Sequence, residues 1–209
     1  MNQKIKSIIK ASFIFSIYCW FRGFRSPLER IVFYWEGFRY YIFNHILTYF
    51  PNHLLRIFYL RRVLGVSIGK ECFIHMGCFF AGNNTIIGNN TVIGRNCYLG
   101  SGGKGGRLII KNNVSLTAQT YIFCATHLTK SPIFECVNRE VTIEDYAWVG
   151  ARAMILPGVR IGKGAVLGAA STATKDVPDY AVYAGSPAKE VGQREKELVY
   201  TLKYFPCFQ

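Results

Sequence analysis

The sequence predicts a mainly β protein built as a parallel β-helix. Between residues 141 and 178 an aliphatic residue returns every six positions, at Ile143, Val149, Ile155, Ile161 and Leu167. Four positions after most of these residues the side chain is small, at Ala147, Ala153, Ala165 and Ser171. An amphipathic helix repeats every three to four residues and an exposed strand alternates. A fixed recurrence at six over five units therefore indicates short strands stacked in successive coils.

The same spacing continues upstream in three shorter runs. They are Ile68, Ile74 and Phe80, then Ile87, Ile93 and Leu99, then Ile110, Leu116 and Ile122. The runs are separated by a one-residue shift near Ile86, a glycine-rich insertion at 101–107 and a long excursion at 124–140. Insertions in repeat proteins form loops, often on the binding face, so we expect chemistry in the two larger ones.

The first 65 residues differ from the rest in composition. They hold ten Lys and Arg against two Glu, and 17 of the 32 aromatic residues, in a chain of net charge +13. We predict three parts: a basic, aromatic, helical segment at 1–65, the β-helix with an active-site loop (124–141) at 66–188, and a C-terminal helix at 189–209. The last prediction depends on Glu190 and Arg194 at i, i+4 and on apolar residues spaced as on one helix face.

Helices are expected on both sides of Pro51 in the N-terminal segment. One begins with Ser26 as N-cap and Pro27 in the first turn, and another follows Asn52 and ends at Gly65. The uncharged run at 11–21 is shorter than the roughly 20 residues that span a bilayer, and no small-residue cleavage site follows it. Two interpretations stay open. The helices bind the membrane surface, with aromatic rings at headgroup depth, or they only cover the first coil. Because the cations stand among bulky aliphatics, no nucleic-acid role is expected.

The seven cysteines do not form a metal or redox pattern. Cys72, Cys78 and Cys97 occupy the small inward position of the repeat, where a thiol acts as a compact hydrophobe. There is no C-x-x-C pair and no Cys/His spacing typical of zinc. Zinc-dependent β-helix enzymes need three histidines, and the β-helix holds only His75 and His127. We therefore expect no metal and a cytoplasmic protein with reduced cysteines.

Four motifs occur in order along residues 65–194: Ala125–Thr126–His127, the Trp148 segment DYAWVG, TKDVP at 174–178 and AGSPAK at 184–189. With the six-residue ladder, they resemble the hexapeptide-repeat acetyltransferases of the galactoside, maltose and xenobiotic branch, and especially bacterial O-acetyltransferases of polysaccharide biosynthesis. The resemblance implies a left-handed β-helix, acetyl-CoA as acyl donor, and a homotrimer with its active sites between neighbouring subunits.

The resemblance also assigns the site. His127 matches the general base, and an unperturbed pKa of about 6.5 leaves imidazole largely neutral near pH 7. Without the motif, a lone histidine would be assigned to a coil corner, and an acyl-enzyme on Cys124 is a weaker alternative because nothing nearby lowers its pKa. Residues matching the acetyl-CoA groove are Trp148, Ala151, Ala169, Thr174, Lys175 and Lys189. Either lysine could instead be solvated surface.

Two positions depart from the family. The asparagine that helps to bind the oxyanion falls on Cys97, so Asn96 beside it, or N–H groups of the glycine-rich insertion, are the candidates for that role. A second C-terminal arginine falls on Gly192, with Arg194 the nearest substitute.

The predicted function is transfer of acetyl from acetyl-CoA to a sugar hydroxyl of a polysaccharide or lipid-linked precursor. Peripheral contact with the cytoplasmic face of the inner membrane would place the enzyme beside such precursors. A nucleotide-sugar, amino-acid or xenobiotic acceptor stays open, as does a β-helix that acts only as a scaffold.

Overall fold

The computed structural model describes residues 27–103 and 106–203. The chain consists of two compact units, residues 1–39 and 40–209. Helix α2 (Pro27–His45) belongs to both. It begins where the sequence predicted a helix, while its expected N-cap Ser26 and the uncharged run at 11–21 lie outside the described residues.

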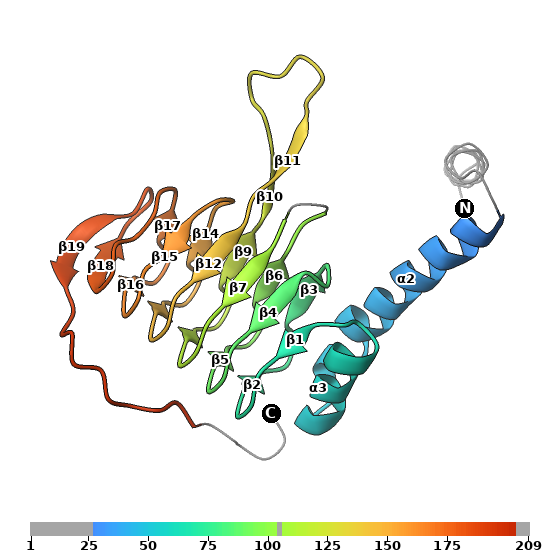
Figure 1. Ribbon diagram of the computed structural model, residues 1–209, viewed down its shortest axis with the longest axis horizontal. Helices are drawn as coiled ribbons and strands as arrows, with labels where there is room; N and C mark the ends of the chain where they lie inside the picture. Colours follow the sequence, from blue (N-terminus) through green and yellow to red (C-terminus); the bar gives the residue numbers. More distant parts are fainter. Residues whose placement is uncertain (1–26, 104–105, 204–209) are drawn as a thin grey trace, which may run out of the picture. The chain divides into compact units, whose positions relative to one another are not determined.

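The second unit is a solenoid of short parallel strands arranged in three sheets (Figure 1). The first sheet contains β1 (Ser67–Ile68), β4 (Thr85–Ile87), β7 (Leu108–Ile110), β12 (Val141–Ile143) and β15 (Arg160–Ile161). The second contains β2 (Phe73–Ile74), β5 (Val92–Ile93), β8 (Ser115–Leu116), β13 (Trp148–Val149), β16 (Val166–Leu167), β18 (Ala181–Ala184) and the antiparallel β19 (Lys189–Gln193). The third contains β3 (Phe79–Ala81), β6 (Tyr98–Gly100), β9 (Tyr121–Phe123), β14 (Met154–Ile155) and β17 (Thr172–Ala173).

Each coil turns at three corners. The first corner joins the first sheet to the second, at 69–72, 88–91, 111–114, 144–147, 162–165 and 178–180. The second corner joins the second sheet to the third, at 75–78, 94–97, 117–120, 150–153 and 168–171. The third corner returns to the first sheet, at 82–84, 101–107, 124–140, 156–159 and 174–176. Both large insertions found in the sequence therefore lie at the third corner.

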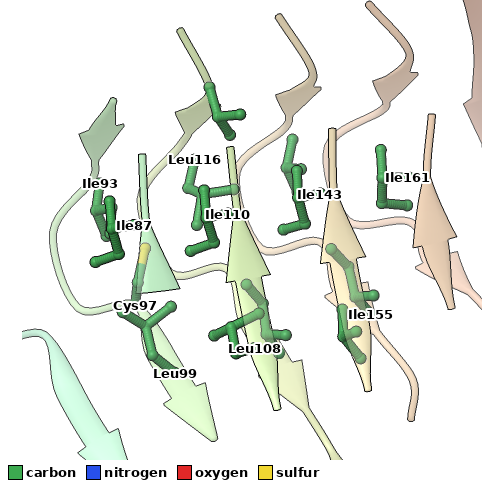
Figure 2. Close-up of a cluster of buried hydrophobic side chains, with 14 of the residues drawn as sticks. Ile87, Ile93, Cys97, Leu99, Leu108, Ile110, Leu116, Ile143, Ile155 and Ile161 are labelled. Atoms are coloured by element: carbon green, nitrogen blue, oxygen red, sulfur yellow. The ribbon is translucent and has the colours of Figure 1, made fainter. Parts of the chain in front are cut away.

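The aliphatic residues of the repeat stack inside the solenoid (Figure 2). Ile87, Ile110, Ile143 and Ile161 are in register on successive strands of the first sheet. The small corner residues Ala147, Ala153 and Ala165 are fully buried. Cys72, Cys78 and Cys97 are buried free thiols, as predicted. One buried aliphatic per strand thus supplies a continuous core.

Close stacking explains the glycines that begin corners. A Cβ built on Gly150 would lie 2.5 Å from the backbone nitrogen of Ala169 in the next coil. No real Cβ tolerates such a distance, so a side chain there would push the coils apart.

The first coil is covered by residues 40–64. Helix α3 (His53–Arg62) is capped by the Asn52 side chain, and η1 (Leu47–Tyr49) precedes it. The Asn44 side-chain amide donates to the Phe80 carbonyl and accepts from its N–H, both at 3.0 Å. Leu60 and Leu64 are buried in the common core. These contacts satisfy the open edge of the first coil, as a capping repeat must.

The surface of the N-terminal helices is rich in exposed apolar side chains. Trp35 and Phe38 on α2 are more than half exposed, as are Leu54 and Phe58 on α3. Within the described part of the chain, every helix is too short or too polar to cross a membrane.

The predicted C-terminal helix was wrong. Residues 189–193 form β19, which pairs antiparallel with β18, and the described residues 194–203 contain no helix. Strand β18 would otherwise leave an unpaired sheet edge, and pairing satisfies its backbone. The Arg194 guanidinium does not pair with Glu190; it donates to the carbonyl oxygens of Tyr146 and Gly164.

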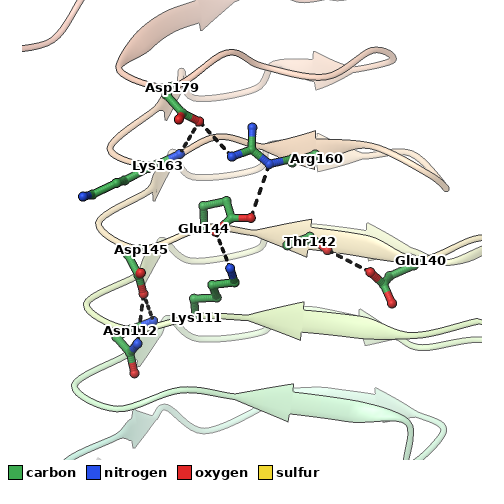
Figure 3. A network of polar contacts seen from close by, with 9 residues as sticks. All are labelled: Lys111, Asn112, Glu140, Thr142, Glu144, Asp145, Arg160, Lys163 and Asp179. Atoms are coloured by element: carbon green, nitrogen blue, oxygen red, sulfur yellow. Dashed lines mark hydrogen bonds and ion pairs between the residues drawn. The ribbon is translucent and has the colours of Figure 1, made fainter.

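Charged residues join successive coils along the first corner (Figure 3). Glu144 accepts from Lys111 Nζ at 2.7 Å and from Arg160 Nε at 3.3 Å, and Arg160 also reaches Asp179 at 2.9 Å. This ladder of ion pairs links the coils on both sides of the long excursion at 124–140.

Candidate functional site

The long excursion forms a β-hairpin that projects from the solenoid (Figure 1). Strands β10 (Ala125–His127) and β11 (Cys136–Asn138) pair antiparallel, and His127 lies opposite Cys136. At the base, Asn138 Oδ1 accepts from the Gly103 N–H at 3.2 Å, so the glycine-rich insertion packs on the hairpin. The hairpin therefore carries His127 away from the core, at the third corner, and its side chain is exposed.

Phe134 holds the His127 ring in one orientation. The two rings are stacked, with centroids 3.9 Å apart and planes 9° from parallel. Nδ1 of His127 lies 2.8 Å from the Phe134 carbonyl oxygen. A carbonyl oxygen only accepts, so Nδ1 carries the hydrogen. In the neutral ring the lone pair is then on Nε2, where it is available to take a proton.

Three of the residues predicted to bind acetyl-CoA lie on neighbouring coils. Ala151 and Ala169 stand one above the other at the second corner, where the Ala170 N–H donates to the Ala151 carbonyl at 2.8 Å. Trp148 lies on β13, just before this corner, and is 48% exposed. Its Nε1 donates to Thr117 Oγ1 at 3.2 Å in the coil below. An exposed indole beside two small corner residues makes a shallow apolar wall.

The other residues predicted to bind acetyl-CoA lie near two different corners of the solenoid. Lys189 pairs with Ala184 in the β18–β19 hairpin, one coil above Gly168. The turn of that hairpin packs on β17, since Ser186 Oγ donates to Thr172 Oγ1 at 3.0 Å. Lys189 is thus near the second corner. Thr174 and Lys175 are exposed beyond the other end of β17, at the third corner.

Asn96 lies at the second corner, below Ala151. It has a φ of +56°, and the residue above it in the next coil, Gln119, donates its N–H to the neighbouring Arg95 carbonyl. His127 lies beyond the opposite end of β9, at the third corner. Within one chain the structure therefore groups Asn96 with Trp148, Ala151, Ala169 and Lys189 near the second corner, and it places Thr174 and Lys175 at the third corner, as it does His127.

Comparisons with known proteins agree with this architecture. Residues 140–175 match the family model described as bacterial transferase hexapeptide (six repeats). The chain is similar to a galactoside O-acetyltransferase of Lactococcus lactis, with 40% identity over 83 residues, covering 38% of this chain and 40% of the relative. It spans less than half the length of the curated relatives it matches.

Two solved structures share the fold. A maltose O-acetyltransferase from Clostridium difficile superposes with a TM-score of 0.67 at 26% identity, covering 78% of this chain and 86% of that one. A hexapeptide-repeat acetyltransferase from Vibrio cholerae, solved with acetyl-CoA, gives a TM-score of 0.68 at 22% identity, covering 82% and 92%. Residues 140–175 thus carry the bacterial transferase hexapeptide repeat, and the chain shares the fold of hexapeptide-repeat acetyltransferases.

The structure adds two features of this hexapeptide-repeat protein that the sequence did not reveal. Phe134 orients His127, although it stands seven residues away in an irregular segment. Arg152 lies at the second corner, and its Nε donates to Gln119 Oε1 at 2.9 Å. Neither had a motif to mark it, although the absence of Asp and Glu from the sequence of this corner could have marked Arg152 as a cation without an acid nearby.

Cys124 is buried at the base of the hairpin in this hexapeptide-repeat protein. Its Sγ donates to the Arg107 carbonyl at 3.3 Å, and burial raises its pKa to about 11. The thiol is therefore protonated near pH 7 and is a poor nucleophile. A side chain enclosed in the coil corner also has no open face for a thioester.

Proposed function

We propose that this protein is an acetyl-CoA-dependent O-acetyltransferase in which His127 is the general base. The observation that carries the proposal is the hydrogen bond from Nδ1 of His127 to the Phe134 carbonyl, because it leaves Nε2 as the basic nitrogen on an exposed hairpin. Relatives and structural neighbours named as acetyltransferases support the same reaction class.

The proposed step is a direct transfer. Nε2 of His127 takes the proton of an acceptor hydroxyl while that oxygen attacks the thioester carbonyl of acetyl-CoA. The tetrahedral oxyanion then collapses, the carbon–sulfur bond breaks, and the protonated imidazole returns its proton to the departing thiolate. The products are an O-acetyl ester and CoA. Asn96 is the proposed donor to the oxyanion, since preorganised donors stabilise charge that develops in the transition state.

The separation of His127 from the acetyl-CoA-binding residues at the second corner favours an active site formed between two subunits. Trp148, Ala151, Ala169 and Lys189 would hold acetyl-CoA along the second corner of one subunit, with Thr174 and Lys175 of the neighbouring subunit, at its third corner, near the adenine end. His127 extends from the third corner. In a homotrimer whose axis runs parallel to the solenoid, rotation keeps each residue at its own height. His127 of one subunit, which follows the coil of β9, can then meet the second corner of the next subunit between Asn96 and Ala151.

We propose a sugar hydroxyl on a polysaccharide or lipid-linked precursor as the acceptor, with the N-terminal helices at the cytoplasmic face of the inner membrane. The exposed aromatic residues of α2 and the exposed Arg61 and Arg62 at the end of α3 support this. Aromatic rings favour headgroup depth, and arginines favour anionic lipid. Nucleotide-sugar, amino-acid and xenobiotic acceptors are the alternatives that an acceptor panel distinguishes.

Acetyl-CoA turnover with His127→Ala tests the mechanism. We expect the release of free thiol in the presence of glycan acceptors to fall by about 10²- to 10⁴-fold, while calorimetric binding of CoA stays unchanged. His45→Ala, an exposed histidine on α2, is the matched control and should keep full activity. Equal turnover in the wild type and His127→Ala would contradict the role of the base and favour a non-catalytic scaffold.

Liposome flotation tests the membrane contact in the full-length protein. Trp35→Glu with Phe38→Glu changes two exposed side chains without touching the cap of the first coil. We expect less flotation with anionic vesicles and unchanged acetyl transfer to a soluble acceptor. Equal flotation of both proteins would contradict the interfacial role of α2.

A further inference from the structure

The first and second corners of the solenoid differ in their charged residues. At the first corner, Glu144 and Asp179 are paired with Lys111 and Arg160. The second corner, residues 75–78, 94–97, 117–120, 150–153 and 168–171, contains two arginines and no Asp or Glu. Among the described residues no carboxylate forms an ion pair with Arg95 or Arg152. The charges of the first corner hold coils together, whereas Arg152 at the second corner bonds Gln119 and Arg95 is exposed without an ion pair among the described residues.

A hollow of about 510 Å³ lies beside Arg95. Val92 and Ser115, which are in register on β5 and β8, line it, as do His75, Arg95 and Thr117. Trp148 stands above, since its Nε1 donates to Thr117. Such a volume is typical of small-molecule sites. The hollow thus continues the wall formed by Trp148 and Ala151 toward the first coils.

We propose that this hollow is the acceptor subsite and that Arg95 selects an acceptor carrying a carboxylate or phosphate close to the hydroxyl that is acetylated. The proposal rests on the proposed acetyl transfer. Acetyl-CoA held at Ala169 and Ala151 would present its thioester at the level of Thr117, directly above the hollow. An acceptor hydroxyl must lie within hydrogen-bond reach of both the base and the thioester carbon, and the hollow provides that position.

The chemistry of the lining suits an anionic sugar. A guanidinium offers paired N–H donors that match a carboxylate or phosphate. The Ser115 and Thr117 hydroxyls both donate and accept, as sugar hydroxyls require. Burial, together with the charges of Arg95 and Arg56, lowers the pKa of His75, so its ring is neutral near pH 7. Arg95 is therefore the cation of this hollow.

Equilibrium binding without acetyl-CoA tests the subsite directly. Three matched probes are a glucuronate-containing disaccharide, the corresponding glucose disaccharide and a hexose phosphate, titrated calorimetrically into the wild type, Arg95→Gln and Arg95→Lys. We expect the wild type to bind an anionic probe at least tenfold more tightly than the neutral one. Arg95→Gln should weaken the anionic probe by about 10- to 100-fold, the value of a charge-assisted hydrogen bond, and leave the neutral probe unchanged. Arg95→Lys should recover part of the loss. The preferred anion identifies a carboxylate or a phosphate acceptor.

Lys196→Gln, at an exposed cation beyond β19, is the control for a general effect of surface charge and should bind every probe as the wild type does. Equal affinity of the wild type for anionic and neutral probes, or an Arg95→Gln variant that keeps the preference, would overturn the subsite. CoA binding measured in parallel separates the two proposals. If the wild type does not bind CoA, the proposed acetyl transfer is contradicted. The preference for anionic probes tests only the role of Arg95.

Discussion

The ring of His127 lies flat against the ring of Phe134, and its Nδ1 donates to the carbonyl oxygen of the same residue at 2.8 Å. One residue thus fixes both the plane and the tautomer of the imidazole. Stacked aromatic pairs contribute about 0.5–1.5 kcal/mol beyond area burial, enough to favour one ring orientation on an exposed hairpin.

Phe134→Ala removes the stacking partner and keeps the backbone carbonyl. We expect kcat for acetyl transfer to fall by about tenfold, in line with the energy of an aromatic pair, with little change in the KM for acetyl-CoA. Steady-state kinetics measure both quantities. Ile133→Ala, at an 80% exposed neighbour, is the control. Equal kcat in the two variants would show that the ring of Phe134 does not position His127.

Cys124→Ala removes the thiol nearest to the hairpin base. Because burial raises the pKa of Cys124 to about 11, we expect no contribution of a thiolate to turnover near pH 7. Acetyl transfer by the variant should stay within about twofold of the wild type, because the loss of one small buried group affects stability rather than chemistry. Mass spectrometry after incubation with acetyl-CoA should detect no acetyl group on Cys124. An acetylated thiol that disappears in the variant together with activity would establish a covalent intermediate instead.

Because of Asp179, the solenoid should lose stability as the pH falls into the acidic range. Partial burial raises its pKa, but the Lys163 N–H and the Arg160 guanidinium outweigh this effect and hold the pKa below the ordinary 3.8. A lowered carboxyl pKa stabilises the folded state above pH 3.8, and that stabilisation is lost as the pH falls toward the folded-state value. We expect Asp179→Asn to lower Tm at pH 7 and to approach the wild type below about pH 4.

Thermal unfolding of both proteins between pH 7 and pH 3 measures this difference. Glu195→Gln, at an exposed carboxylate beyond β19, should follow the wild type throughout. A Tm difference for Asp179→Asn that is constant with pH would indicate that charge on Asp179 does not contribute.

Substitutions of Ile110 and Ile109, neighbours on strand β7, test the contribution of the core to stability. Ile110 is fully buried in the stack (Figure 2). Ile109, with its side chain on the opposite face of β7, is only partly buried. We expect Ile110→Ala to lower the free energy of unfolding by about 2–5 kcal/mol and Ile109→Ala by about 1 kcal/mol. Urea unfolding followed by circular dichroism measures both. Equal losses of unfolding free energy in the two variants would contradict the assignment of Ile110 to the common core.

The repeat made the solenoid predictable from the sequence. Each aliphatic residue of the ladder has the same environment in every coil, so a local pattern specifies the three sheets. The insertions at 101–107 and 124–140 were visible as breaks in that pattern. Strand β19 was not predictable, because Glu190 and Arg194 have helical spacing, whereas the conformation of this segment depends on the open edge of β18.

The sequence by itself determined the coil repeat, the inward aliphatic stack, the small corner residues and the location of His127 in an insertion. Only the tertiary structure decided which corner each candidate residue occupies, that Phe134 orients the imidazole, and that Arg95, which has no ion pair in the described part of the chain, borders a hollow. The physical reason is distance along the chain. Periodicity is a local property, whereas a site arises from residues that stacking brings together from different coils.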